Sequence, residues 1–229
     1  MKKLIISFIL FILVATPIVL ADSSITVETT INENVYVTLN LANIERQTYD
    51  EIKAQGFSIS TVPNAIEEKL KQQNLTDARV IYDFDQRIFN NATSSIYVKF
   101  LLTGSDIISY TLNGTDMTRT FRVRTDWRKF EISFTQNFSL NFEEYFGDPL
   151  TEWQQVDGKA FEKIIEDPFE MSFRFILPEK AFDVQAEGDT VIFKVPPAFE
   201  DRLLNSPFLI LGAIIIANII FIAYRKVRK

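Results

Sequence analysis

The longest uniformly hydrophobic stretch of the chain runs from Pro207 to Tyr224 and contains no charged residue. An uninterrupted helix of this length rises about 27 Å, which is close to the thickness of the hydrocarbon core of a bilayer. A buried helix of a soluble domain would normally carry a polar face, whereas this stretch shows only Asn218. The pattern predicts a transmembrane helix over 207–224, followed by a basic tail at 225–229.

Residues 1–21 have the three-part pattern of a secretory signal peptide. Two lysines form the positive start, an apolar run follows, and Val19 to Ala21 offer small residues before a cleavage site. An uncleaved anchor is the alternative, although residues 4–20 are barely long enough to span a bilayer. In both cases the basic tail at 225–229 is expected in the cytoplasm and the region between the two segments outside. We therefore expect a single-pass protein of the cell membrane whose bulk is extracytoplasmic.

Alternation of apolar and polar residues dominates the region between these segments, residues 22–198. A period of two is typical of half-buried strands in antiparallel sheets. The Asn113-Gly114 dipeptide between two such runs is a strong hairpin signal. The predicted strands lie at 25–31, 35–41, 57–62, 78–84, 96–103, 106–112, 116–124, 169–177 and 190–195.

The clearest alternation covers residues 130–142. Apolar residues occupy six of seven alternate positions, with only Gln136 out of line: Phe130, Ile132, Phe134, Phe138, Leu140 and Phe142. Polar residues fill the positions between them. The pattern predicts one long, half-buried antiparallel strand.

Helical spacing appears in three places. A thin apolar stripe predicts a helix over 43–55 that Gly56 ends, and Pro63 with the pair Ile66 and Leu70 predicts another through about residue 73. A third helix is expected from Asp148-Pro149 to residue 167, because apolar residues recur at helical spacing there: Trp153, Val156, Ala160 and Ile164. Gly158 is its weak point.

Together these patterns predict an α+β fold: a sandwich-like extracytoplasmic domain dominated by antiparallel sheet, with two or three short helices and one C-terminal transmembrane helix. The polar run at 90–95 is a candidate subdomain boundary. Residues 199–206 are expected to form a juxtamembrane stem, with a short helix over 199–204.

Composition excludes several chemistries. The chain of 229 residues has neither His nor Cys, so disulfides, thiolate catalysis and histidine-based catalysis are absent. All 30 acidic residues but only 18 of the 24 basic residues lie between the two hydrophobic segments, which gives that region a net charge of −12. An acidic domain has no general attraction for nucleic acid, so no nucleic-acid partner is expected.

Four Asn-x-Ser/Thr triplets lie in the predicted exterior domain, and they are candidate glycosylation sites: Asn74, Asn91, Asn113 and Asn137. Three of them fall in predicted loops or turns, and Asn137 falls on the polar side of its strand. Because a glycan needs an exposed, accessible position, the sequence predicts a glycoprotein.

One basic, aromatic-containing patch stands out in the acidic domain: Arg119, Arg122, Arg124, Trp127 and Arg128. Bidentate arginine contacts and stacking on tryptophan would suit an anionic ligand or an acidic partner. The alternative is cross-strand ion pairing, because strand alternation puts Arg122 and Arg124 on one side and Arg119 on the other.

Within the predicted membrane helix, Ala213 and Ala217 are spaced for close approach of a second helix, and Asn218 can hydrogen-bond to it. These residues predict contact with another membrane protein or with a second copy of the chain. The sequence gives no oligomeric state.

Carboxylates are the remaining candidates for chemistry. Asp83 and Asp85 lie at a strand end, but no calcium-loop pattern surrounds them, so neither a metal site nor a cofactor is expected. A glycosidase pair needs two carboxylates held about 5–10 Å apart in a cleft. Candidates for such a pair are Glu143, Glu144, Asp148, Glu166, Asp167 and Glu170.

The favoured hypothesis is a structural or binding subunit of a cell-envelope or membrane-protein assembly, with no enzymatic activity. It follows from the missing catalytic residue types and from a tail of about five residues, too short for a signalling domain. The alternative is a membrane-tethered, carboxylate-dependent hydrolase of surface glycans. Two converging, desolvated carboxylates in a cleft would favour the enzyme, and a sheet face with exposed aromatic residues would favour the binding subunit.

Overall fold

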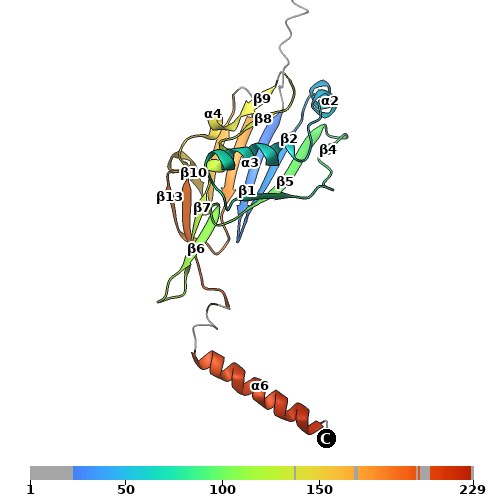
Figure 1. The fold of residues 1–229 in the computed structure, drawn as a ribbon. Coiled ribbons are helices and arrows are strands. Elements are labelled where there is room, and N and C mark those ends of the chain that lie inside the picture. The colour runs from blue at the N-terminus through green and yellow to red at the C-terminus, as the bar shows by residue number, and fades with distance from the viewer. Residues whose placement is uncertain (1–22, 137, 168–169, 200, 202–206, 228–229) are drawn as a thin grey trace, which may run out of the picture.

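The computed structural model describes residues 23–136, 138–167, 170–199, 201 and 207–227. The predicted signal peptide at 1–21 lies outside these residues. The largest element is sheet A, whose strands run in the order β10-β11-β12-β1-β2-β5-β3, with β4 also paired to β5 (Figure 1). Its strands are β1 (Ser24–Ile31), β2 (Val35–Ala42), β3 (Arg79–Tyr82), β4 (Phe89–Asn90), β5 (Ser95–Thr103), β10 (Gln154–Val156), β11 (Ala160–Ile165) and β12 (Glu170–Ile176).

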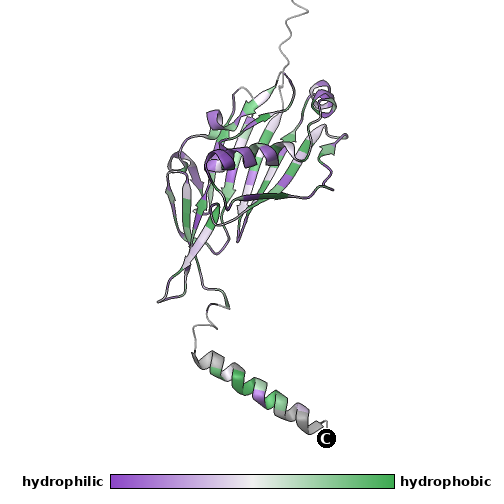
Figure 2. Cartoon of the chain, in the orientation of Figure 1, coloured by the Kyte–Doolittle hydropathy of each residue, from purple (hydrophilic) through white to green (hydrophobic). Residues whose placement is uncertain are grey.

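Sheet A is antiparallel except between its two central strands, β1 and β12, which run parallel. Alternate side chains of each strand point to opposite faces, so the register aligns apolar residues in rows. Val27, for example, lies opposite Leu39 on one side and Phe173 on the other, and all three are buried. Figure 2 shows the resulting stripes of hydrophobic and hydrophilic positions along the strands.

Two smaller sheets complete the β-structure. Sheet B has the order β13-β14-β7-β6 and is antiparallel throughout, and sheet C is the hairpin β8-β9. Their strands are β6 (Ile108–Leu112), β7 (Arg119–Arg124), β8 (Glu131–Ser133), β9 (Ser139–Asn141), β13 (Phe182–Glu187) and β14 (Thr190–Val195). One hydrophobic core cluster includes buried residues from all three sheets.

The helices are short apart from the last one. They are α2 (Arg46–Ala54), α3 (Thr61–Gln72), α4 (Phe142–Phe146), the 3₁₀ helices η1 (Asp126–Arg128) and η2 (Leu150–Glu152), and α6 (Pro207–Val227). The two helices predicted near 43–55 and 63–73 are confirmed as α2 and α3. Gly56 follows α2 with φ +86°, a conformation that favours glycine and ends the helix. In Figure 1, α3 crosses one face of sheet A, and it buries Val62, Ile66 and Leu70.

The single long strand predicted over 130–142 is wrong, although its buried face is correct. The segment folds back into β8 and β9, with Ile132 opposite Leu140, and Phe142 begins α4. Five of the six predicted apolar side chains are buried and Phe138 is partly buried. The turn keeps the alternation in phase across the hairpin, so a hairpin and a continuous strand give the same pattern.

The helix predicted from Asp148 to residue 167 is also wrong. Residues 154–156 and 160–165 form the hairpin β10-β11, and Ile164 is 53% exposed. The reversal is made by Asp157 and Gly158, whose φ angles are +51° and +65°. Positive φ at both central residues is the requirement of a type I′ hairpin turn, which Asp-Gly favours. Gly158, the residue least compatible with the predicted helix, is therefore part of the turn that joins β10 to β11.

Two smaller differences concern one loop and one strand. Residues 57–62 form a turn and the start of α3 instead of a strand, and β13 was missed by the alternation analysis. The polar run at 90–95 connects β4 to β5, which pair with each other in the same sheet. Of the predicted stem at 199–206, only Phe199 and Asp201 lie within the described residues.

The architecture agrees with the predicted fold class at the level of an antiparallel-dominated, sheet-rich α+β domain. The C-terminal helix α6 runs over 21 residues, but the side chains at 207–210, 213, 222–223 and 225–227 lie outside the description. Within the described part of the chain, no helix is long and apolar enough to cross a membrane. The transmembrane span over 207–224 therefore stays a prediction.

Candidate functional site

The basic patch predicted from the sequence does not form one surface. β7 alternates, with Phe121 and Val123 buried and Arg122 and Arg124 on the other side. Trp127 lies in η1 with 0% exposure, donates its indole N–H to the Arg124 carbonyl at 3.0 Å, and packs against aromatic rings of β12. It is therefore out of reach for stacking against a ligand.

Arg128 is the most buried charge in the described residues. Its side chain has 0% exposure, and all five of its N–H donors are used. Nε donates to the Phe146 carbonyl at 2.8 Å, one terminal nitrogen donates to the carbonyl and hydroxyl of Thr125, and the other donates to the Asp148 carbonyl and to Asp189 Oδ1 at 2.7 Å. We call these contacts the Arg128 network.

The Arg128 network ties together η1, the end of α4, the loop before η2 and the turn between β13 and β14. Burial lowers the pKa of the Arg128 guanidinium, while the hydrogen bond and charge of Asp189 act in the opposite direction. Burial alone would raise the pKa of Asp189, but hydrogen bonds from Lys129 and Arg128 outweigh it and hold that pKa below its usual value. The role of Arg128 is thus to hold loops together rather than to bind a ligand.

The other arginines are distributed over separate surroundings. Arg124 forms two hydrogen bonds to Asp126, both 2.9 Å, and Arg119 pairs with Asp201 from the segment that precedes α6. Arg122 is exposed, and no described residue forms a hydrogen bond or ion pair with its side chain. Arg119, Arg124 and Arg128 are therefore ion-paired, but none of these pairs joins two neighbouring strands, whereas the alternative interpretation expected cross-strand pairs.

A polar hollow of about 500 Å³ lies on the outer side of sheet B, next to Arg122 and Arg124. The carboxylates of Asp106, Asp126 and Asp189 also line it. Because three carboxylates face two guanidiniums, the hollow has no excess of positive charge with which to hold an anion. Within the residues that the structure describes, no cluster of acidic side chains is suited to a metal ion.

The carboxylates considered for catalysis are solvated. Asp83 and Asp85 are exposed, and Asp83 accepts a hydrogen bond from the backbone N–H of Asp85. Glu143 pairs with Lys69 at 3.2 Å, and Asp148 pairs with Lys163. The remaining candidates are exposed as well: Glu144, Glu166, Asp167 and Glu170.

A general acid at neutral pH requires a carboxyl group whose pKa is raised by burial. Every described carboxyl group with a shifted pKa has it lowered instead, mostly by hydrogen bonds from neighbouring donors: Asp77, Asp116, Asp183, Asp189 and Asp201. These carboxylates are stabilised in the charged form and are unsuited to donate a proton at neutral pH.

The outer face of sheet A is the surface that the sequence analysis did not single out. Its exposed large side chains include Tyr36 at 40%, Tyr97 at 42%, Ile81 at 52% and Ile164 at 53%. The register places Tyr97 and Ile164 at the two ends of one row across five strands, with Asn40, Thr26 and Ser172 between them. At about 4.8 Å per strand this row is about 19 Å wide. The tyrosines on the polar side of β2 and β5 were the signal in the sequence.

An open hollow of about 500 Å³ continues this face at the edge formed by β4 and β5. Asn40, Arg87, Asn90, Ser95 and Tyr97 line it, so guanidinium, amide and hydroxyl groups surround an aromatic ring. Ile88 and Phe89 complete the lining, so two aromatic rings lie among hydrogen-bonding groups, and such a surface is suited to recognition of a partner.

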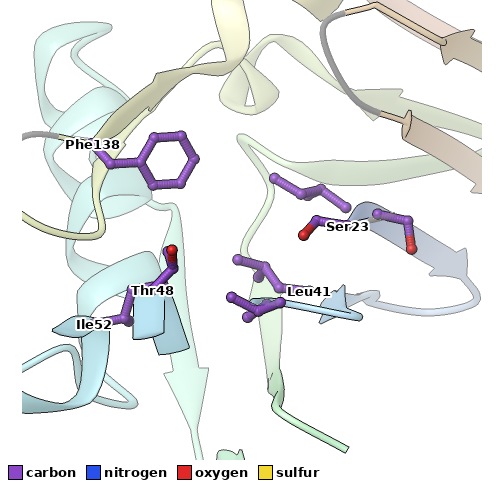
Figure 3. A pocket seen from close by; sticks show the side chains of 8 residues that line it. Ser23, Leu41, Thr48, Ile52 and Phe138 are labelled. Carbon is purple, nitrogen blue, oxygen red and sulfur yellow. The ribbon is translucent and has the colours of Figure 1, made fainter. Parts of the chain in front are cut away.

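A small cavity near the start of sheet A is too small for a ligand. It has a volume of about 20 Å³ and lies between the start of β1 and helix α2. Figure 3 shows Phe138, Thr48 and Ile52 on one side and Leu41 and Ser23 on the other. Space for about one water molecule between mostly apolar side chains is an imperfection of packing and not a binding site.

Three of the four glycosylation candidates are described, and all three are exposed in loops or turns. Asn74 follows α3 with φ +58°. Asn91 Oδ1 accepts hydrogen bonds from Tyr49 and Lys53, and Asn113 Oδ1 accepts one from the backbone N–H of Thr115. Asn137 lies outside the described residues.

In α6, Ala217 and Asn218 are exposed, whereas the side chain of Ala213 lies outside the description. Asn218 donates from Nδ2 to the Ile214 carbonyl of its own helix at 2.8 Å. This bond leaves the amide oxygen of Asn218 as an acceptor for a second helix. No protein-family model, curated protein or solved structure matches this chain.

Proposed function

We propose that this protein is a single-pass, membrane-anchored binding or structural subunit of a cell-envelope or membrane-protein assembly, with its β-rich domain outside the cell. The observation that carries the proposal is the outer face of sheet A. Tyr36 and Tyr97 are about two-fifths exposed there. The cross-strand neighbours of Tyr36 are Leu101 and Thr30, and Asn40 and Arg87 line the hollow beside Tyr97. Exposed aromatic residues on a sheet face are typical of protein–protein contact surfaces.

The partner that fits this face is another membrane or envelope protein. The rows through Tyr97 and Tyr36 carry hydroxyl, amide and apolar groups. The row between them carries charged groups: Lys99, Glu28, Arg174 and Glu162. A partner with a mixed apolar and polar surface would match both kinds of row. No metal or cofactor is needed for this function.

Anchoring rests on the sequence of α6 and on its position in the chain. The charge-free run from Pro207 to Tyr224 continues as helix α6 to Val227, with Arg225 and Lys226 at its end. In the sequence, a charge-free run of 18 residues has no stable place on the surface of a soluble acidic domain, and this supports the proposed anchor. The positive residues beyond it favour a cytoplasmic C-terminus.

The hydrolase alternative has weaker support. Its candidate carboxylates are exposed, and the shifted pKa values in the domain are lowered rather than raised. Hydrolysis of a surface polysaccharide by the purified protein, with the activity lost in one Asp or Glu variant, would replace the binding proposal with this alternative.

Protease protection on intact cells tests the anchoring. With one epitope tag after Asp22 and another after Lys229, external protease is expected to remove the first tag and spare the second. The opposite pattern, or loss of both tags from unbroken cells, would contradict the proposed topology.

A further inference from the structure

The end of sheet B next to the stem is held to it by one strong contact, the pair of Arg119 and Asp201. Arg119 Nε donates to Asp201 Oδ2 at 2.7 Å and a terminal nitrogen donates to Oδ1 at 2.9 Å. Only 18% and 13% of these side chains are exposed. Asp201 Oδ2 also accepts the backbone N–H of Ala198. We call this bidentate contact the stem clamp, and it fixes Asp201 to the start of β7.

The stem clamp limits how far sheet B can lie from α6. Six residue-to-residue steps separate Asp201 from Pro207. Even a fully extended chain covers at most about 20 Å in six steps. If α6 crosses the bilayer, its first turn lies at the outer interface, whose headgroup layer is about 5–7 Å deep. The clamped end of sheet B is then the part of the domain that faces the membrane.

That end of the sheet exposes apolar and aromatic side chains. Tyr110 is 54% exposed and Leu112 is 41% exposed on β6, and Phe199 in the stem is 71% exposed. Leu112 lies directly opposite Arg119, and the Arg119 guanidinium lies over the Tyr110 ring at 5.1 Å. Figure 1 shows the hairpin of β6 and β7 as the part of the domain that extends furthest on the side where the chain leaves for α6.

We propose that this end of sheet B rests on the outer surface of the lipid bilayer, with Tyr110, Leu112 and Phe199 in the headgroup region. The proposal rests on the membrane anchoring proposed above. Aromatic and leucine side chains are favoured at this depth, because their apolar parts leave water while a tyrosine hydroxyl stays hydrated. The stem clamp keeps the domain in one orientation, so the outer face of sheet A is presented at a fixed angle to the membrane.

The charges at this end favour apolar contact over electrostatic attraction. Asp116 lies in the β6–β7 loop, and Asp183 and Asp201 also lie at this end of the sheet, where each accepts hydrogen bonds from neighbouring groups. Lys194 and Arg119 offset two of these three carboxylates, so the five groups carry a net charge of −1 and do not attract anionic lipids. A zwitterionic bilayer is therefore the expected partner. Vesicles of phosphatidylcholine are the appropriate probe.

Single-cysteine labelling of the full chain in such vesicles tests the proposal, because the protein has no cysteine of its own. A fluorophore is attached at Leu112→Cys or, as the matched control, at Ala92→Cys in the exposed loop between β4 and β5. Quenching by lipids with a nitroxide on the headgroup is expected to be several-fold stronger at position 112. The same labels in the Asp201→Asn background test the clamp, and quenching at 112 is expected to fall toward the value at 92.

Asp183→Asn is the control for the clamp variant, since Asp183 pairs with Lys194 at the same end of sheet B without touching the stem. It should leave the quenching at 112 unchanged. Equal, weak quenching at 112 and 92 in a chain that resists extraction by alkaline carbonate would overturn the inference and leave the membrane anchor intact. Unchanged quenching at 112 in Asp201→Asn would overturn the clamp. Release of the chain by carbonate would overturn the anchor and this inference together.

Discussion

Arg119 and Arg128 lie nine positions apart, and each holds a loop through contacts with a carboxylate, yet their surroundings differ completely. Arg128 is fully buried and satisfies four carbonyl or hydroxyl groups besides Asp189. Arg119 is the first residue of β7, at one end of sheet B, and its main partner is one carboxylate from the stem. The Arg128 network serves the fold, whereas the stem clamp joins the fold to the segment that leads to α6.

The difference shows that neighbouring arginines in the sequence need not share a function. A buried guanidinium is costly to desolvate, so removal of its partners or of the arginine itself leaves polar groups unsatisfied. The Arg119–Asp201 pair is also largely shielded from solvent, but it joins the sheet to the stem and so fixes the direction of that segment. Each prediction below breaks or sharpens this comparison.

Arg128→Ala is expected to have the largest effect on stability. The change removes five hydrogen bonds and leaves the carbonyls of Thr125, Phe146 and Asp148 without that donor, so we expect a loss of about 3–5 kcal/mol in the free energy of unfolding. Urea unfolding of the detergent-solubilised chain, followed by tryptophan fluorescence, measures it. Arg122→Ala is the control and should cost less than about 0.5 kcal/mol. Equal midpoints for the two variants would refute a structural role for Arg128.

Asp189→Asn sharpens the same side of the comparison through pH. In the original protein, hydrogen bonds from Lys129 and Arg128 lower the pKa of the Asp189 carboxyl in the folded state. The stabilisation by this carboxylate is therefore complete above the pKa of an unfolded aspartate, near 4, and is lost as the pH falls through the lower pKa of the folded state. At neutral pH the variant should cost about 2 kcal/mol. The difference from the original protein should stay constant between about pH 5 and 8 and shrink below about pH 4. A difference that persists in acid would show that the charge of Asp189 is not what stabilises the fold.

The sequence predicts the elements that a local residue pattern determines, and it misses those whose structure depends on contacts between distant residues. Alternation located most strands, because residues two apart share a face whatever the strand pairs with. It failed at 130–142, where a hairpin keeps the same phase, and at 153–164, where helical spacing coincides with a hairpin turned by Asp157 and Gly158. In the second case the Asp-Gly dipeptide was the available signal.

The candidate site was harder to predict for a different reason. Arg128 and Asp189 are 61 positions apart, and Arg119 and Asp201 are 82 apart, so no local spacing connects the partners. Sequence alternation did separate Arg119 from Arg122, as the structure confirms. It gave no reason to expect that Trp127 and Arg128 leave the strand and enter the core through η1.

On the other side of the comparison, acid should open the stem clamp. Hydrogen bonds from Arg119 lower the pKa of Asp201, so the contact is complete above the usual aspartate value and is lost as the pH falls through the lowered one. Lipid quenching of a label at position 112 should therefore be constant from about pH 8 to 5 and decline only below about pH 4. A decline near neutral pH would mean that another group controls the contact.

The smallest expected effect is a difference in glycan occupancy between two glycosylation candidates in different parts of the domain. Among the described candidates, Asn74 lies in the turn after α3, whereas Asn113 lies in the β6–β7 loop that faces the membrane in our proposal. In a host that glycosylates this protein, Asn74→Gln should remove more glycan than Asn113→Gln. Mass spectrometry of the intact chain measures the difference, and full occupancy at Asn113 would argue against a loop that rests on lipid.

Photo-crosslinking from the outer face of sheet A tests the central claim most directly. A photoreactive amino acid replaces Tyr97 in the full chain, and in a second variant it replaces Arg122 on the outer side of sheet B, before irradiation of intact membranes. We predict one specific membrane or envelope protein joined to position 97, identified by mass spectrometry, and no such product from position 122. The same product from both positions, or none from position 97, would contradict a binding function for this face.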